Sequence, residues 1–333
     1  MRKVLLPCAL ALATACSGNG SPEPRDSTTA QNRLTIVTTV APITNLVHNI
    51  AGDLADVSGL VPEGVNSHTF EPSPSDAALI AEADLVFANG LHLEVPALEL
   101  AEQNLAPEAR IVTLAEQTIS EDEWIYDFSF PASQGDPNPH LWTNPAYANR
   151  YARLIARTLA DRDPENARTY LGNADVLELR FDALVEAVET ATATVPEDAR
   201  KLLTYHDSFP YFARTFGWEI IGAIQPSDFS EPTAREVGDL IEQIEREQIP
   251  AIFGSEVFPS PVLEAIAAET GATYVDDLRD DDLPGDTDDA DHSLLGLLVF
   301  DFTTIVEALG GDASAFAAVD TSNLHVESTV VYR

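Results

Sequence analysis

The stretch that organises this chain is residues 163–194, DPENARTYLGNADVLELRFDALVEAVETATAT. Asp163-Pro164-Glu165-Asn166 is typical of a helix start, because proline fits the first helical position and acidic side chains favour a helix N-terminus. No further proline follows up to Thr194, and the apolar residues predict a single buried stripe. The stripe consists of Leu171, Val176, Leu177, Leu179, Phe181, Leu184 and Val185. A helix of ~30 residues is ~45 Å long, enough to link two lobes.

On both sides of this helix, short β-branched runs alternate with longer amphipathic segments, which is typical of βα units and parallel sheets. The predicted strands are 34–40, 57–61, 84–88, 110–114, 201–205, 219–224, 251–254 and 273–276. The predicted helices between them are 42–51, 75–82, 94–104, 208–216, 232–247, 260–269 and 293–309. We therefore predict an α/β fold in which a long rigid helix bridges two mainly parallel-sheet lobes. The expected parts are a lobe at 33–162, the linking helix at 163–196, a lobe at 197–312 and a tail at 313–333.

The N-terminus is typical of an exported lipoprotein. Arg2 and Lys3 precede the apolar run 4–15, which is too short to span a membrane, so residues 1–16 are predicted to be a signal peptide. Ala13-Thr14-Ala15-Cys16 resembles a bacterial lipobox, in which Cys16 becomes the lipid-modified terminus; the alternative is an ordinary secretory signal. Residues 17–32, rich in small and polar side chains, are expected to form a flexible tether.

The charge balance is strongly acidic, with 18 basic against 55 acidic residues and a net charge of -37. Such a surface repels phosphate backbones, so we expect no nucleic-acid partner. We interpret the acidity as an adaptation to high salt, which screens like charges over a few Å. The acidic run 276–291 is expected to be a solvated loop, and it lacks the spacing of a calcium-binding loop.

Three of the seven histidines stand where a predicted strand or its following loop ends. His68 lies in a loop shaped by proline and glycine, His140 follows the stiff segment Asp136-Pro137-Asn138-Pro139, and His206 closes a strand. Ligands of open α/β sheets bind outside the carboxyl ends of the strands, so these histidines are expected to meet at one cleft. Three imidazoles suit zinc, and a carboxylate would complete a tetrahedron. Asp280, Asp281 and Asp282 all follow the last strand, and the spacing does not choose among them.

The other four histidines are expected to have ordinary roles. His48 should be a packing or surface residue of a helix, His92 part of a turn, and His325 part of the tail. His292 should cap the last helix, with an extra metal ligand as the alternative.

The order of these motifs resembles a known family, the zinc- and manganese-binding solute-binding lipoproteins of bacterial ABC transporters. Residues 61–76, around His68, resemble their first ligand loop. Residues 136–144 resemble the second, an Asp-Pro-His-x-Trp pattern extended here by Asn138 and Pro139. Residues 204–217, with His206, resemble the third. The likeness continues through residues 231–271 and spans 34–310 in one order.

The resemblance implies a metal held between two lobes by one residue from each of four loops. The family's fourth ligand is an Asp in an Asp-Ser-Leu type motif. Matching that motif to Asp281-Asp282-Leu283 makes Asp281 the first choice, whereas counting from the strand gives Asp280. Asp207 and Glu256 are expected to accept hydrogen bonds that orient the ligands, or else to be ordinary polar residues at strand ends.

The implied function is capture of Zn²⁺, or of Mn²⁺, outside the cytoplasmic membrane and delivery to a membrane permease that a cytoplasmic ATPase drives. We expect a monomer that is not an enzyme and is anchored to the cell membrane by its N-terminal lipid. Residues 117–136 lack the histidine-rich loop of some zinc-specific members, but three imidazoles and one carboxylate favour zinc, because manganese prefers more oxygen ligands. The alternatives are a zinc-dependent hydrolase and an adhesion or interaction lipoprotein.

Overall fold

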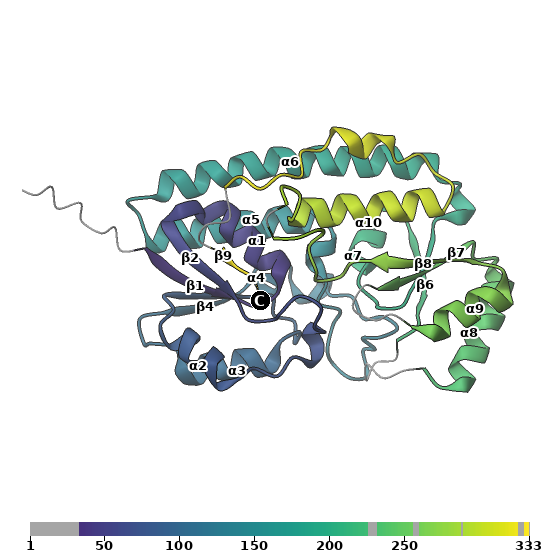
Figure 1. Cartoon of the computed structure of the whole chain (residues 1–333), viewed down its shortest axis with the longest axis horizontal. Coiled ribbons are helices and arrows are strands. Elements are labelled where there is room, and N and C mark those ends of the chain that lie inside the picture. Colours follow the sequence, from purple (N-terminus) through teal and green to yellow (C-terminus); the bar gives the residue numbers. More distant parts are fainter. Residues whose placement is uncertain (1–32, 226–231, 256–259, 288, 326–329, 333) are drawn as a thin grey trace, which may run out of the picture. The chain divides into compact units, whose positions relative to one another are not determined.

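Two parallel β-sheets form the framework of the protein (Figure 1). The computed structural model describes residues 33–225, 232–255, 260–287, 289–325 and 330–332. The signal peptide and tether predicted for residues 1–32, with Cys16, and the predicted orienting residue Glu256 lie outside these ranges. Among the residues described, no helix combines the length and apolar character that crossing a membrane requires.

The first sheet has the strand order β4-β3-β1-β2-β9 and the second β6-β5-β7-β8, with every pair parallel. Ile36 of β1 pairs with Val57 of β2 and Leu85 of β3, and all three side chains are buried. The strands of the first sheet are β1 (Leu34–Thr38), β2 (Ala55–Gly59), β3 (Leu85–Ala88), β4 (Arg110–Thr113) and β9 (Val330–Val331). Those of the second are β5 (Lys201–Thr204), β6 (Glu219–Ala223), β7 (Ala251–Ser255) and β8 (Thr273–Leu278). The predicted fold class is confirmed.

Most of the helices begin with a proline in their first turn, where its missing N–H has no partner to lose. In the first half the helices are α1 (Ala41–Ala51), α2 (Pro74–Ala81), α3 (Val95–Asn104), α4 (Leu114–Thr118) and α5 (Pro145–Arg162). In the second half they are α7 (Pro210–Phe216), α8 (Ala234–Glu247), α9 (Pro261–Thr270) and α10 (Leu294–Ala308). Gly217 and Gly271 end α7 and α9 in the left-handed conformation that glycine adopts without strain. Helices α4 and α5 were not predicted from the sequence.

The linking helix α6 (Ala167–Thr194) passes above both sheets, with α10 beside it (Figure 1). It begins later than predicted, because Asp163 ends α5 and its carboxylate accepts hydrogen bonds from Asn166 Nδ2 and Tyr170 Oη in the intervening turn. The buried stripe follows a spacing of four and three residues: Tyr170, Ala174, Leu177, Phe181, Leu184, Val188 and Ala191. The prediction was therefore wrong for Leu171, Val176 and Leu179, which are 40%, 42% and 71% exposed.

The C-terminal tail returns to the first sheet, which the sequence did not indicate. Strand β9 pairs with β2, and Asn45 of α1 ties the tail to the core. The Asn45 side chain donates to Asn323 Oδ1, Tyr332 Oη and the His292 carbonyl, and it accepts from Leu294 N. Residues 33–333 form one compact unit, so the expected lobe boundaries stay a prediction.

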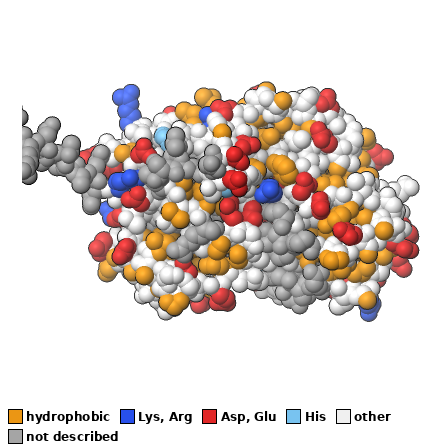
Figure 2. All heavy atoms as spheres, viewed as in Figure 1, with side chains coloured by type: hydrophobic (Ala, Val, Ile, Leu, Met, Phe, Trp, Pro, Cys, Tyr) orange, Lys and Arg blue, Asp and Glu red, His pale blue; other side chains and the backbone are white. Residues whose placement is uncertain are grey.

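The acidic run 276–291 is only partly the solvated loop we expected. Strand β8 extends to Leu278, and the side chains of Asp280, Asp281 and Leu283 are buried. The acidic surface itself is diffuse: Figure 2 shows Asp and Glu side chains spread over one face with few Lys or Arg between them.

The Asn45 contacts predict a stability effect. Asn45→Ala removes four hydrogen bonds between α1 and the C-terminal part of the chain, including the one that the buried Leu294 N–H donates, so the free energy of unfolding should fall by about 2–4 kcal/mol in urea denaturation. Asn104→Ala, which removes only an exposed bond to Leu100 O within α3, should change it by less than about 0.5 kcal/mol. Equal effects of the two substitutions would show that the tail contacts contribute nothing.

Candidate metal centre

The three histidines predicted to bind metal lie at the carboxyl ends of the two sheets. His68 sits in a short 3₁₀ turn, Ser67–Thr69, beyond β2, where Asn66 Oδ1 accepts the His68 backbone N–H. His140 immediately precedes a second 3₁₀ turn, Leu141–Thr143, that leads into α5. His206 follows β5 and precedes α7. His140 and His206 are buried, and His68 is partly exposed.

The Nε2 atoms of these histidines converge. They are separated by 3.2 Å between His68 and His140, 3.2 Å between His68 and His206, and 3.0 Å between His140 and His206. An ion ~1 Å out of the plane of this triangle would be ~2.1 Å from each nitrogen, which is a zinc-to-imidazole distance. Within the described residues, this triad is the group whose ligand atoms could hold one metal ion.

Two side-chain amides orient these rings. Asn138 Oδ1 lies 2.9 Å from His140 Nδ1, and Gln225 Oε1 lies 2.7 Å from His206 Nδ1. The Asn138 Nδ2 group donates to the Asp207 carbonyl and to Asp127 Oδ2, so its oxygen must face His140. An amide oxygen only accepts, so each Nδ1 carries the proton and each Nε2 keeps its lone pair for a metal.

Burial and mutual repulsion favour the neutral form of His68 and His140. Burial lowers the pKa of His68 well below its ordinary value, and the neighbouring His206 lowers it further. Burial also lowers the pKa of His140, with smaller contributions from His206 and His68. Two of the three rings are therefore neutral at physiological pH, which is the form that binds metal.

Asp280 and Asp281, the two candidates for a fourth ligand, have different surroundings. Both carboxylate oxygens of Asp280 accept hydrogen bonds, one from Ser208 Oγ and the other from Ser255 Oγ at 2.8 Å. Asp281 Oδ1 is buried and has no hydrogen-bond partner in the described part of the chain. Burial raises the pKa of Asp281 to about 8, against the opposing effect of the Ser67 hydroxyl, and the charges of Asp280, Asp282 and Glu94 add to the increase. A dication beside it would favour the ionised form.

The carboxyl group of Asp207, expected to orient a ligand, instead faces a second buried acid. Burial, and then the neighbouring Asp207, raise the pKa of Asp127 to about 9, and burial raises that of Asp207. The two carboxyl groups therefore share a proton at neutral pH. Asp207 contributes to the orientation of His140 through its backbone carbonyl, which Asn138 Nδ2 reaches at 2.6 Å.

The remaining histidines lie apart from the triad. His48 is a buried packing residue, as expected, and burial lowers its pKa to about 4. His92 lies in a turn, also as expected, with a positive φ of 65°. His325 lies against Gly52, at the end of α1. His292 does not cap α10, since Ser293 holds that position and accepts from Gly296 N.

Sequence reasoning missed the two orienting amides. Asn138 could have been found, because it lies between the two prolines that carry His140. Gln225 is 19 residues beyond His206, at the end of β6, and only the parallel pairing of β5 with β6 brings it close. No local signal in the sequence marks it.

Comparisons with known proteins identify the family. The model of the family described as "Zinc-uptake complex component A periplasmic", ZnuA, matches residues 36–308. The chain belongs to this family. Members of the ZnuA family are metal-binding components of ABC importers and not enzymes, so the zinc-dependent hydrolase alternative is wrong for this chain.

Individual relatives have different metals in their names. The iron-binding protein YfeA of Yersinia pestis is 27% identical, over 86% of this chain and 89% of its own length. The zinc-binding protein TroA of Treponema pallidum is 26% identical, over 93% of this chain and 99% of its own length. The solved structure of the periplasmic zinc-binding protein TroA matches with a TM-score of 0.75, over 83% of this chain and 99% of that structure. A manganese-bound periplasmic metal-binding protein from candidatus Liberibacter asiaticus matches with a TM-score of 0.72, 28% identity and coverage of 83% and 100%.

The contact to Gln225 predicts a graded loss of metal affinity. Gln225→Ala removes the acceptor that fixes the His206 tautomer, so titration calorimetry should show zinc affinity reduced about 10–100-fold, with one equivalent still bound. Gln117→Ala, which removes an exposed amide bonded to Thr113 O, is the matched control and should leave affinity unchanged. Unchanged affinity in Gln225→Ala would contradict the orienting role.

The buried carboxyl group of Glu94, at the N-terminus of α3, should make the stability of the protein depend on pH. Burial raises the pKa of Glu94 from 4.5 to about 7. Hydrogen bonds from Thr39 Oγ1 and from the N–H groups of Asn89 and Gly90 lower it, but by less than burial raises it. The folded state therefore holds the proton more tightly than the unfolded chain, and the free energy of unfolding should fall as pH rises from about 4.5 to about 7. The expected contribution is about 3 kcal/mol.

The test compares unfolding of the metal-free protein across this pH range. Glu94→Gln should lose about 3 kcal/mol less stability than the parent between pH 4.5 and 7. Glu99→Gln, which changes an exposed carboxylate of the same helix, should keep the parent's pH dependence. If all three proteins show one pH profile, Glu94 ionises normally.

Proposed function

We propose that this protein captures Zn²⁺ and delivers it to the membrane permease of an ABC importer driven by a separate ATPase. Nε2 of His68, His140 and His206 would supply three neutral ligands, and Asp281 would supply the anionic fourth. The observation that carries this proposal is the convergence of three Nε2 atoms within 3.2 Å of one another, with the Nδ1 positions of two of the rings bonded to amide oxygens. The Nε2 lone pairs of His140 and His206, 3.0 Å apart, repel each other unless a cation or a proton lies between them.

The choice of Asp281 over Asp280 rests on their hydrogen bonds. Asp280 is engaged by two serine hydroxyls, and its backbone carbonyl accepts from Trp142 Nε1 at 2.9 Å. It is thus suited to hold the end of β8 in place. The Ser67 hydroxyl lies beside the Asp281 carboxyl group, but the buried Oδ1 of Asp281 has no hydrogen-bond partner in the described part of the chain. A buried carboxylate oxygen without a hydrogen bond costs free energy that a metal would recover.

The preference for zinc rests on the chemistry of the donors. Three imidazoles and one carboxylate suit a tetrahedral, borderline-soft ion, whereas manganese favours sites richer in oxygen. The names of the relatives include zinc, iron and manganese, so membership of the family does not by itself choose the metal.

The cellular setting belongs to the same proposal. Relatives such as FimA of Streptococcus parasanguinis are named as substrate-binding lipoproteins of metal ABC transporters. We extend this to Cys16 as the lipid-modified residue and to residues 17–32 as the tether to the membrane surface. The protein would then wait for metal as a membrane-anchored monomer on the outer side of the cytoplasmic membrane.

Calorimetric titration in high salt, with purified full-length protein stripped of metal, tests the site. We expect one tight equivalent of zinc and much weaker manganese binding. His140→Ala should weaken zinc binding by more than about 100-fold, beyond the ~10–100-fold cost of losing only an orienting partner. His325→Ala, which removes a histidine bonded to Asn173 Nδ2 away from the three loops, is the control and should bind as the parent does. Weak binding of many equivalents, unaffected by His140→Ala, would mean that the acidic surface is being titrated.

The two aspartates can be separated by conservative changes. Asp281→Asn removes the proposed anionic ligand, so zinc affinity should drop by more than about 100-fold at pH 7. Asp280→Asn keeps an oxygen that accepts from one serine, so affinity should stay within about tenfold of the parent. The opposite ranking would assign the fourth ligand to Asp280.

A further inference from the structure

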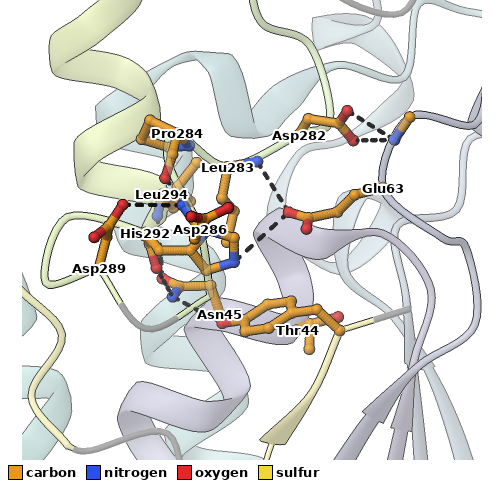
Figure 3. Close-up of polar contacts among 12 residues, drawn as sticks. Thr44, Asn45, Glu63, Asp282, Leu283, Pro284, Asp286, Asp289, His292 and Leu294 are labelled. Atoms are coloured by element: carbon orange, nitrogen blue, oxygen red, sulfur yellow. Dashed lines mark hydrogen bonds and ion pairs between the residues drawn. The ribbon is translucent and has the colours of Figure 1, made fainter.

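Two loops of the metal centre are hydrogen-bonded to each other in a reciprocal way (Figure 3). The Gly64 N–H, in the loop that carries His68, donates to Oδ1 and Oδ2 of Asp282 at 2.9 and 2.7 Å. The Leu283 N–H, in the segment that carries Asp281, donates to Glu63 Oε1 at 3.3 Å. Each loop thus offers a backbone donor to a carboxylate of the other.

The conformation of Gly64 makes this contact possible. Its φ of +75° lies in the left-handed region, which glycine adopts without strain. A Cβ added there would meet no atom within 4 Å, so the requirement at this position is conformational and not one of space.

The segment after Asp282 is also fixed to the first half of the chain. His292 is buried, and its Nε2 lies 3.6 Å from Glu63 Oε1 while its Nδ1 lies 3.3 Å from the Pro284 carbonyl. The Asn45 side chain of α1 binds the His292 carbonyl and the Leu294 N–H. Figure 3 shows these residues grouped around His292, with Glu63 reaching toward it from the loop of His68.

Asp281 consequently stands between two anchors. On one side, Asp280 is held by Ser208 and Ser255, which follow β5 and end β7 in the second half of the chain. On the other side, Asp282 is held by the loop of His68, which follows β2 in the first half. A movement that draws His68 away from Asp281 must therefore break the bonds of Asp282 and Glu63 first.

We propose that Glu63 and Asp282 are positioning residues that form an interlobe clasp and slow the release of metal. The proposal rests on the proposed function, because it takes His68 and Asp281 to be ligands. The clasp touches no metal itself. It holds two ligand-bearing loops at bonding distance with charge-assisted hydrogen bonds, so that dissociation of the ion requires their rupture.

The test is the rate at which zinc leaves the full-length protein, measured by stopped-flow mixing with excess chelator. Asp282→Ala and Glu63→Ala each remove an acceptor of the clasp and should release zinc about tenfold faster. Asp282→Asn and Glu63→Gln keep one acceptor oxygen and should lie between the parent and the alanine variants. This ordering separates the effect of the lost hydrogen bond on the release rate from the effect of the lost charge. Both replacements at a position remove the same charge, but only the amide keeps an acceptor.

Asp286→Ala is the matched control. It removes a charge from an exposed side chain of the same segment and should leave the release rate unchanged. The melting temperature of each metal-free variant should stay within a few degrees of the parent, whereas the increase on adding zinc should be smaller in the alanine variants.

Two failures are distinguishable. If the parent binds one zinc tightly and all four clasp variants release it at the parent's rate, the clasp is wrong and the proposed function stands. If the parent binds no zinc tightly, the proposed function fails. Faster release in Asp286→Ala by the same factor would assign the effect to general charge and would also overturn the clasp. If an alanine variant does not fold, its amide counterpart decides the matter in the same way.

Discussion

Most of the site depends on three imidazoles whose Nε2 atoms lie 3.0 to 3.2 Å apart. The arrangement sets the Nε2 lone pairs of His140 and His206 against each other in a buried place, so it is unfavourable unless the surrounding structure enforces it or a cation relieves it. Asn138 and Gln225 enforce it through the opposite side of two rings. The fold brings the three loops together because the carboxyl ends of both parallel sheets face one region.

Prolines and hydrogen bonds remote from the metal position fix the segments that bear the ligands. The Pro137-Asn138-Pro139 segment fixes His140, and the indole of Trp142 then bonds to the Asp280 carbonyl and joins this loop to the end of β8. Asn45 holds the C-terminal part of the chain in a similar way. Its side chain hydrogen-bonds to Asn323, Tyr332 and the start of α10, and so fixes them to α1. Ligands from distant parts of the sequence are thus held by contacts that do not themselves touch the metal position.

The fold class and the histidine triad could be predicted from the sequence because their signals are local. The βα alternation sets the sheets, and His68, His140 and His206 follow strands or proline-fixed loops. The spacing of the residues alone could not decide between Asp280 and Asp281, since adjacent carboxylates differ only in what Ser208 and Ser255 reach after folding. The same holds for Gln225 and for the pairing of β9 with β2. The stripe of α6 was misassigned because Leu179 is apolar yet lies on the exposed side, while Tyr170 and Ala174 face the core.

The atoms that surround the bound ion are the most direct test of the proposed site. X-ray absorption spectroscopy at the zinc edge, on protein loaded with one equivalent, reads this out without any substitution. We expect a first shell of four nitrogen and oxygen atoms at ~2.0–2.1 Å, with the outer-shell scattering of three imidazoles. A shell of six oxygen atoms without imidazole scattering would place the ion on the acidic surface and contradict the account.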